Sequence, residues 1–183
     1  MRGVIRLKNI LDVGCGNQKR PHAIGVDCNP NTSADIIHDL NVFPYPFEDS
    51  VFDEIYADNV MEHLDNVIRV MEELHRISQP NGRIKVIVPY FRSQWACIDP
   101  THKHYFTADS FNYFDPSHMM HTRYNYSAVK YKVESVVFNE SLSRGLFMSS
   151  IKYLANKNPQ RYEHYLGHFF PLDSLTFYLR TIK

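Results

Sequence analysis

The strongest constraint on the fold is a short apolar run that ends in two closely spaced glycines. Residues 9–13 (NILDV) form this run, and Gly14 and Gly16 follow it on either side of Cys15. A short apolar run predicts a buried strand, and glycines after it let the backbone approach a ligand closely. In open α/β folds, ligands bind at the carboxyl edge of the sheet. The sequence therefore predicts an α/β fold with a binding site at the end of this strand.

The rest of the chain alternates between patterns typical of strands and patterns typical of helices. Short apolar runs predict further strands at residues 23–27, 34–38, 51–57, 83–88, 131–138 and 175–182. Helical spacing predicts helices at residues 60–77, 107–114, 143–157 and 160–169. The first of these helices has Asn59 as its expected N-cap and Pro80-Asn81-Gly82 after its end. Residues 116–128 show no clear periodicity and are interpreted as a mobile loop or lid, and the alternation as a whole predicts a mostly parallel sheet.

Two connections near the start of the chain are too short for a normal parallel crossover. Six residues separate Gly16 from the strand at 23–27, and six more separate that strand from the one at 34–38. A parallel crossover normally needs a dozen residues or more, usually with a helix. We therefore expect the first two crossover helices to be missing and one face of the sheet to be bare. A bare face is a natural contact surface, so we predict a homodimer.

Composition and charge limit the class of function. The chain has 183 residues, enough for one domain, with 20 Lys and Arg against 20 Asp and Glu. A net charge of zero argues against a nucleic-acid partner, which selects for a basic excess. No apolar run reaches the length of a membrane span and no signal peptide is recognisable, so no membrane partner is expected. Three cysteines without a CxxC pair, Cys15, Cys28 and Cys97, predict reduced thiols and a cytoplasmic location.

Charged and aromatic residues are divided unevenly along the chain. Residues 1–91 contain 9 Lys and Arg against 13 Asp and Glu, whereas residues 92–183 contain 11 against 7. Only 7 of the 25 Phe, Tyr and Trp residues precede residue 92. One interpretation is a single domain at 1–183 in which 1–91 is a cofactor-binding half and 92–183 is an acceptor-binding or cap half. The other is one fold whose last elements pack with aromatic rings.

Four segments together resemble a known family. LDVGCG (11–16), GVDCNP (25–30), the stretch from 34 to 64 and RISQPNGRIKVIVP (76–89) are similar, in order, to motifs of class I S-adenosylmethionine-dependent methyltransferases, type 11 small-substrate group. The short GCGNQKRPHAIGVD stretch (14–27) resembles a subgroup that lacks the first crossover helix. A dinucleotide site is the competing reading of the glycines, but Lys19 occupies the third glycine position of that motif. The resemblance implies a Rossmann-like, mostly parallel seven-stranded sheet with shortened first crossovers and an antiparallel last strand.

The resemblance also implies a cofactor, S-adenosyl-L-methionine, with S-adenosyl-L-homocysteine as its product. The implied cofactor-binding residues are Asp12, Gly14, Cys15, Gly16, Asp27, Asp39, Leu40, Asp58 and Asn59. Among them, Asp27 would hold the ribose hydroxyls, Asp39 and Leu40 the adenine, and Asp58 and Asn59 the methionine amino group. The chain departs from the family at 17–19 (NQK), where most members have another glycine and a helix N-terminus. Lys19 or Arg20 could bind the methionine carboxylate instead.

Histidines give the candidates for catalysis. Glu62 and His63 match a Glu-His pair of the family, and DPTHKHYFT (99–107) resembles a segment that reaches over the acceptor pocket. The candidate catalytic residues are therefore His63, His102 and His104, which could bind the acceptor or act as a general base near neutral pH. The alternative is a loop held together by histidine hydrogen bonds.

A metal site is a second interpretation of the same region. Asp99, His102, His104, His118 and His121 are suitable ligands, but no firm ligand-spacing rule is met. We therefore predict no bound metal.

Taken together, these patterns predict methyl transfer to oxygen, nitrogen or carbon of a small-molecule acceptor. The alternative is a catalytically inactive cofactor-binding module that acts through a protein partner, which the shortened crossover and Gln18 in place of a glycine would suit. A third reading, methylation of RNA or of a protein, is disfavoured because residues 57–60 (ADNV) lack the NPPY-type tetrapeptide of many amino-group methylating enzymes.

Overall fold

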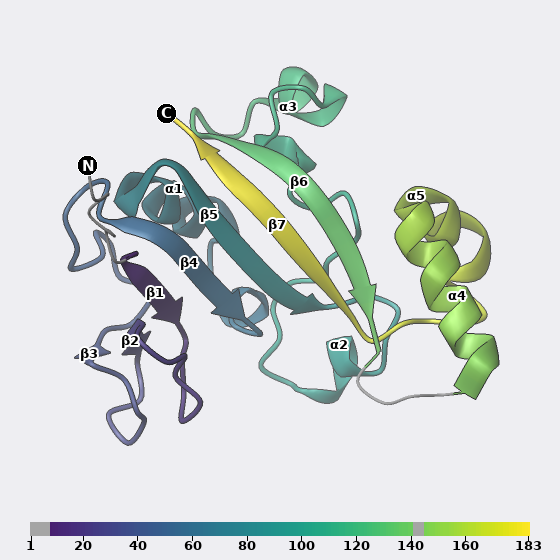
Figure 1. Ribbon diagram of the computed structural model, residues 1–183, viewed down its shortest axis with the longest axis horizontal. Helices are drawn as coiled ribbons and strands as arrows, with labels where there is room; N and C mark the ends of the chain where they lie inside the picture. The colour runs from purple at the N-terminus through teal and green to yellow at the C-terminus, as the bar shows by residue number, and fades with distance from the viewer. Residues whose placement is uncertain (1–7, 141–144) are drawn as a thin grey trace, which may run out of the picture.

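A computed structural model describes residues 8–140 and 145–183, and it contains a seven-stranded sheet (Figure 1). The strand order is β3-β2-β1-β4-β5-β7-β6. The strands are β1 (Ile10–Val13), β2 (Ile24–Asp27), β3 (Ile36–Ile37), β4 (Phe52–Asp58), β5 (Ser78–Pro89), β6 (Lys130–Asn139) and β7 (Ser174–Ile182). β1 to β5 pair in parallel, whereas β7 is antiparallel to β5 and to β6. This confirms the predicted α/β class, the mostly parallel sheet and the antiparallel last strand.

The core lies on one face of this sheet, against helix α1 (Val67–Ile77). Alternate residues of the central strands are fully buried on this face, as Ile55, Ile84 and Phe177 show. α1 presents a buried stripe of Val70, Met71, Leu74 and Ile77 at helical spacing. Burial of these side chains is the main force that holds the helix to the sheet.

The predicted start of this helix is wrong. α1 begins seven residues later than the apolar spacing suggests, and the side chain of Asn66 caps it by accepting a hydrogen bond from the amide of Arg69 (3.0 Å). Asn59 instead has a left-handed backbone (φ 52°) and donates its amide to the carbonyl of Ile87 (2.8 Å). A 3₁₀ turn, η1 (Met61–His63), fills the space between them. The predicted end at residue 77 is correct, but β5 starts at once, so residues 80–82 lie within its bounds.

The second half of the chain contains shorter helices than the sequence pattern indicates. Residues 107–114 form only the turn η2 (Asn112–Phe114), and residues 160–169 divide between α5 (Pro159–Arg161) and a π-helical turn, η3 (Tyr162–Leu166). The predicted loop at 116–128 contains helix α3 (Met119–Tyr124), and an unpredicted helix, α2 (Trp95–Ile98), follows β5. Helix α4 (Gly145–Lys157) confirms the helix predicted at 143–157, whose first two residues lie outside the described part of the chain.

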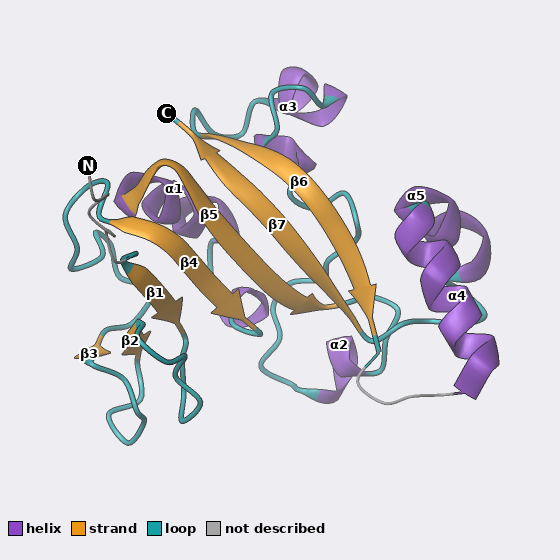
Figure 2. Ribbon diagram, viewed as in Figure 1, coloured by secondary structure: helices purple, strands orange, loops and turns teal. Residues whose placement is uncertain are grey.

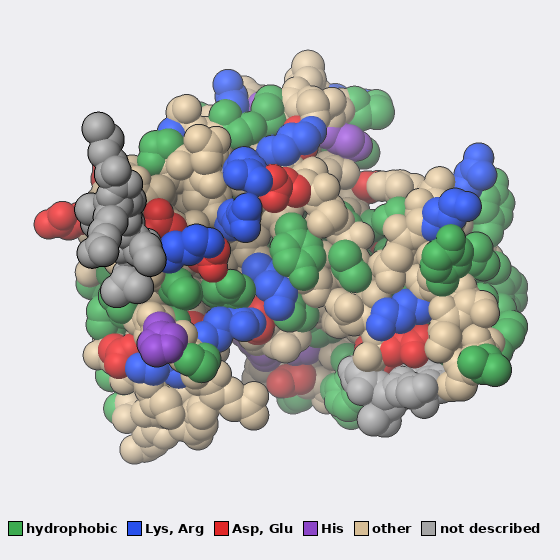
Figure 3. All heavy atoms as spheres, viewed as in Figure 1, with side chains coloured by type: hydrophobic (Ala, Val, Ile, Leu, Met, Phe, Trp, Pro, Cys, Tyr) green, Lys and Arg blue, Asp and Glu red, His purple; other side chains and the backbone are tan. Residues whose placement is uncertain are grey.

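One face of the sheet is bare, as the two short connections predict. Neither connection contains a helix. In Figures 1 and 2, α1 lies behind the sheet, and no helix crosses the front of β1, β4, β5 and β7. Figure 3 shows Lys and Arg side chains spread over this open face. Among the described residues, no helix is long and apolar enough to cross a membrane.

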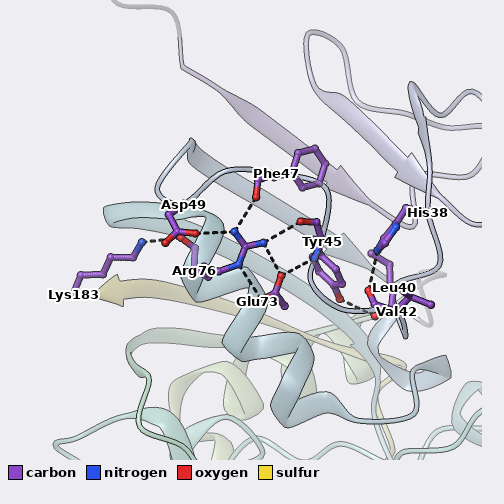
Figure 4. A network of polar contacts seen from close by, with 9 residues as sticks. All are labelled: His38, Leu40, Val42, Tyr45, Phe47, Asp49, Glu73, Arg76 and Lys183. Carbon is purple, nitrogen blue, oxygen red and sulfur yellow. Dashed lines mark hydrogen bonds and ion pairs between the residues drawn. The ribbon is translucent and has the colours of Figure 1, made fainter.

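Arg76 holds the loop between β3 and β4 against α1 (Figure 4). Its guanidinium donates to the carbonyls of Phe47 (2.8 Å) and Tyr45 (3.0 Å), and to the carboxylates of Asp49 (2.8 Å) and Glu73 (2.7 Å). Glu73 in turn accepts a hydrogen bond from the Tyr45 amide (2.8 Å). One charged side chain therefore satisfies several backbone groups of a loop that has no regular structure.

Candidate functional site

The two glycines after β1 both adopt a left-handed backbone, but their surroundings differ. Gly14 (φ 64°) packs so closely on Val60 that an added Cβ would lie 2.6 Å from Val60 Cγ2. Gly16 (φ 51°) faces open space, where an added Cβ would meet no atom within 4 Å. The Gly16 amide donates to Asp27 Oδ2 (2.9 Å), and the Asn29 amide donates to Oδ1 of the same carboxylate (2.9 Å). The turn therefore places the Asp27 carboxylate at the end of β2.

A polar cavity of about 440 Å³ opens beside this turn, and we call it the glycine cavity. It is lined by Asp12, Gly14, Cys15, Gln18, Lys19, Arg20, Pro21, Asp58 and Asn59. Five of the nine predicted cofactor-binding residues thus lie around one space. Gly16 directly follows the lining residue Cys15, and its amide binds Asp27. Asp39 and Leu40 lie on the loop after β3 and line neither this cavity nor the one described below.

Charged groups in the glycine cavity are paired in part. The guanidinium of Arg20 forms an ion pair with Asp58, and the backbone amide of Arg20 donates to Asp12 (2.8 Å). Burial raises the pKa of Asp12, while the neighbouring Arg20 opposes that rise. Lys19 binds Asp35 (2.7 Å) instead of pointing to a free anion site. Asp58 Oδ1 is buried and has no hydrogen-bond partner among the described residues.

This cavity fits an S-adenosylmethionine molecule in its chemistry. The unpaired Asp58 Oδ1 is an acceptor for an ammonium group such as that of methionine. The open space at Gly16, beside the Asp27 carboxylate, suits a ribose diol.

A second cavity, of about 520 Å³, lies beyond the carboxyl ends of β4 and β5, and we call it the histidine cavity. Its lining comes from the residue after β4, η1, the end of β5, α2, the segment after α2, and the start of β7 with the residue before it. These residues are Asn59, Glu62, His63, Ile87, Pro89, Trp95, Ile98, Asp99, His102, Asp173 and Ser174. Asn59 lines both cavities, which makes them neighbours. The histidine cavity combines apolar walls with a few polar groups, as small-molecule sites do.

The structure brings two of the three predicted catalytic histidines together. The rings of His63 and His102 meet edge to face, with 4.7 Å between their centroids. Burial, together with the neighbouring His102, lowers the pKa of His63. His104 does not line the cavity, because its Nε2 lies 2.8 Å from the carbonyl of Leu64 and ties the loop to the end of η1.

Glu62 is the residue whose role sequence reasoning underrated. Its side chain is buried (1 % exposed), and both carboxylate oxygens lack a hydrogen-bond partner among the described residues. Burial raises its pKa to about 7. The match of Glu62 and His63 to a Glu-His pair of the family placed Glu62 near the site. No pattern in the neighbouring sequence indicates that its carboxyl group is buried without a partner.

The ligand set considered for a metal does not assemble. Among the described residues, the group of histidines and acids close enough to share an ion is Glu62, His63 and His102. His118 uses its Nδ1 to cap α3, by accepting the Met120 amide (3.2 Å), and His121 Nδ1 lies 2.9 Å from the Tyr113 carbonyl. Only His102 of the proposed set therefore belongs to the observed cluster.

Comparison with known proteins relates this geometry to one family. A family model described as a methyltransferase domain matches residues 5–181. Among solved structures, an S-adenosylmethionine-dependent methyltransferase from Archaeoglobus fulgidus is 17% identical, with a TM-score of 0.59 over 95% of this chain and 86% of that one. The complex between the Trm112 methyltransferase activator of Haloferax volcanii and its methyltransferase partner matches at 14% identity and a TM-score of 0.61, over 96% and 83%.

A third structure, the plantazolicin methyltransferase BpumL in complex with a plantazolicin analogue and S-adenosylhomocysteine, is 16% identical. Its TM-score is 0.53, over 96% of this chain and 77% of that one. At these identities the structures share the fold with this chain. Among curated proteins, the comparison finds no match.

Proposed function

This chain is a class I S-adenosylmethionine-dependent methyltransferase of the methyltransferase-domain family, and we propose that its acceptor is a small molecule bound in the histidine cavity. One observation carries the proposal: Asn59 lines both the glycine cavity and the histidine cavity, so a methyl donor in the first would face an acceptor in the second. The volume of about 520 Å³ is in the range of small-molecule sites.

The chain's own residues would act mainly by binding and orientation. When bound, S-adenosylmethionine supplies an electrophilic methyl group, so the protein has to place a nucleophile in line with it and exclude water. In this proposal Asp27 accepts hydrogen bonds from the ribose, and Asp58 and Asn59 hold the methionine amino group. His63 and His102 contact the acceptor, with Trp95 and Ile98 as its apolar wall. His104 positions the loop that carries His102.

The test is calorimetric titration of S-adenosylhomocysteine into the native chain and into Asp27→Ala. We expect micromolar binding that the substitution weakens by a factor of about ten or more, the scale of lost hydrogen bonds to a charged group. Glu48→Ala is the matched control, since Glu48 is exposed and makes no ion pair within the described residues. Absence of binding by the native chain at millimolar ligand would contradict the proposal.

The acceptor class is tested by a screen of small molecules that carry a hydroxyl group, an amine or an acidic C–H group. The screen measures the formation of S-adenosylhomocysteine. If a small molecule is methylated and His102→Ala slows that reaction, the histidine cavity is supported as the acceptor site. Turnover that His102→Ala leaves unchanged would place the acceptor elsewhere.

The second candidate function is an inactive cofactor-binding module that acts through a protein partner. The open face of the sheet favours it, because a partner could cover the surface that crossover helices leave bare. The Haloferax volcanii structure is a complex with a methyltransferase activator, so it supports the binding of a protein partner by this fold and not the lack of activity. Cofactor binding without turnover of any acceptor, in the screen above, would favour this candidate.

A further inference from the structure

Three side chains of the histidine cavity form a compact cluster of potential metal ligands. One ligand atom from each of Glu62, His63 and His102 lies within 4.8 Å of the others. Two ligands bound to one divalent ion at about 2.1 Å are roughly 3–4 Å apart. Small movements of these side chains would therefore bring all three onto a common ion.

The two imidazoles are held in the orientation typical of metal ligands. His102 Nδ1 lies 3.1 Å from the carbonyl of Ala96, and since a carbonyl only accepts, Nδ1 carries the hydrogen. His63 Nδ1 lies 2.9 Å from Thr101 Oγ1, whose own hydrogen goes to Asp99 (2.7 Å). Both rings therefore keep an Nε2 lone pair. Metal-binding histidines are fixed in the same way, by a hydrogen bond from the other ring nitrogen.

Glu62 provides an independent reason for a cation. It is 1 % exposed, and neither carboxylate oxygen has a hydrogen-bond partner among the described residues. No lysine or arginine in the described part of the chain forms an ion pair with it. A buried carboxylate without partners is costly, and paired charges or bound metals are the usual compensation.

The sequence pattern predicts no bound metal, but on this geometry we propose that Glu62, His63 and His102 bind a divalent transition-metal cation, of which Zn²⁺ is the simplest example. Two imidazoles and one carboxylate favour such an ion over Mg²⁺ or Ca²⁺, which prefer oxygen ligands. Three protein ligands leave at least one coordination position for a small molecule, and the cluster lines the histidine cavity. The metal site also narrows the class of acceptor, and this part of the proposal rests on the proposed function. The acceptor would be a molecule with an oxygen or nitrogen atom able to bind the metal ion.

The test uses Co²⁺ as a spectroscopic probe, followed by Zn²⁺ competition, on the full chain after treatment with a chelator. We expect visible absorption bands that saturate at one Co²⁺ per chain and disappear when Zn²⁺ is added. Glu62→Gln and His102→Ala should each weaken binding by at least tenfold, the lower end of what loss of even a supporting group costs. His164→Gln, which removes an exposed histidine on η3, should bind as the native chain does.

Glu62→Gln also guards against a loss of folding as the explanation. It replaces a buried carboxyl group that has no hydrogen-bond partner by a neutral amide of the same shape, so its melting temperature without metal should not fall. Zn²⁺ should raise the melting temperature of the native chain and of His164→Gln, but not that of Glu62→Gln. Absence of a saturable Co²⁺ signal in the native chain, or equal Co²⁺ affinity in Glu62→Gln, would overturn the proposal.

Metal binding is measured without cofactor or acceptor, so its outcome is separate from that of the proposed function. A chain that binds S-adenosylhomocysteine but no Co²⁺ would keep the methyltransferase proposal and lose the metal. A chain that binds Co²⁺ but transfers no methyl group would keep the metal site and lose the acceptor assignment.

Discussion

Gly14 and Gly16 have similar backbone conformations but different neighbours, so they can be compared directly. Both have positive φ angles, but only at Gly14 would an added methyl group collide with a neighbour, Val60. A left-handed backbone costs a non-glycine residue about 1 kcal/mol, and overpacking adds about 1–3 kcal/mol. The difference in stability between the two alanine variants therefore measures the steric collision with Val60 separately from the cost of the left-handed backbone.

We predict that Gly14→Ala lowers the free energy of unfolding by roughly 2–4 kcal/mol and Gly16→Ala by about 1 kcal/mol. Urea denaturation of both variants measures this. Adding Val60→Ala to Gly14→Ala should recover part of the loss, because it removes the colliding methyl group. Equal losses in the two single variants would contradict the collision with Val60.

At the scale of elements, Asp115 ties the segment between η2 and α3 to strand β6. Its carboxylate accepts hydrogen bonds from the amide and hydroxyl of Ser117 (2.9 and 2.7 Å) and from the Val133 amide (3.0 Å). It also lies 3.2 Å from the Lys132 ammonium. Val133 is the residue at which the register of β6 against β7 shifts, so the side chain satisfies an amide at an irregular point of the strand.

This arrangement predicts a dependence of stability on pH. Burial opposes ionisation of Asp115, but the hydrogen bonds from Ser117 and Val133 outweigh it and lower its pKa to about 2. The folded state therefore holds this proton less tightly than the unfolded chain. The resulting stabilisation, roughly 2 kcal/mol, is present above pH 4 and is lost as the pH falls toward 2.

Asp115→Asn should accordingly destabilise the chain by roughly 2 kcal/mol at pH 7, and the difference should shrink below pH 4. Urea denaturation of the variant and the native chain at pH 7, 4 and 3 checks this. Glu48→Gln, at an exposed position, is the control and should match the native chain throughout. A difference that stays constant between pH 7 and 3 would show that the carboxylate charge is not the source of the effect.

At the scale of the whole molecule, the open face of the sheet is the main departure from a two-sided α/β fold. Cross-strand neighbours on it include Tyr56, Lys85 and Tyr178 in one row and Arg83 and Arg180 in the next. Arg180 is paired with Glu134, whereas Arg83 and Lys85 form no ion pair within the described residues. The face is thus polar and charged, which lets it remain in water without a covering helix.

The homodimer predicted from this face stays a prediction. Light scattering at tens of micromolar should give twice the 21.5 kDa mass of one chain. Tyr178→Lys, in the middle of the face, should then give a monomer, because association would bury a second positive charge beside Lys85. Tyr153→Lys, on α4, is the control and should leave the mass unchanged. A monomeric mass for the native chain would show that the prediction is wrong.

The secondary-structure boundaries that failed share a physical reason. Apolar spacing is a local signal, and it continues from Val60 into α1 without marking where the helix begins. The start is decided by a long-range hydrogen bond, from Asn59 to Ile87 on β5, and by the cap at Asn66. The helix expected at residues 107–114 likewise reduces to a turn, and there the amide of Ala108 donates to the distant Glu163 carboxylate (2.7 Å).

What the sequence by itself determined is the class of fold and the edge that carries the site. Apolar runs place the strands, short connections exclude two crossover helices, and the glycines after β1 mark the carboxyl edge. These are local properties of backbone and side chain, so a single sequence is enough to predict them. Only the tertiary structure decided which side chains face the histidine cavity. His104 turns to Leu64, whereas His102 joins Glu62 and His63 from a distant segment, because packing of that loop against η1 sets their directions.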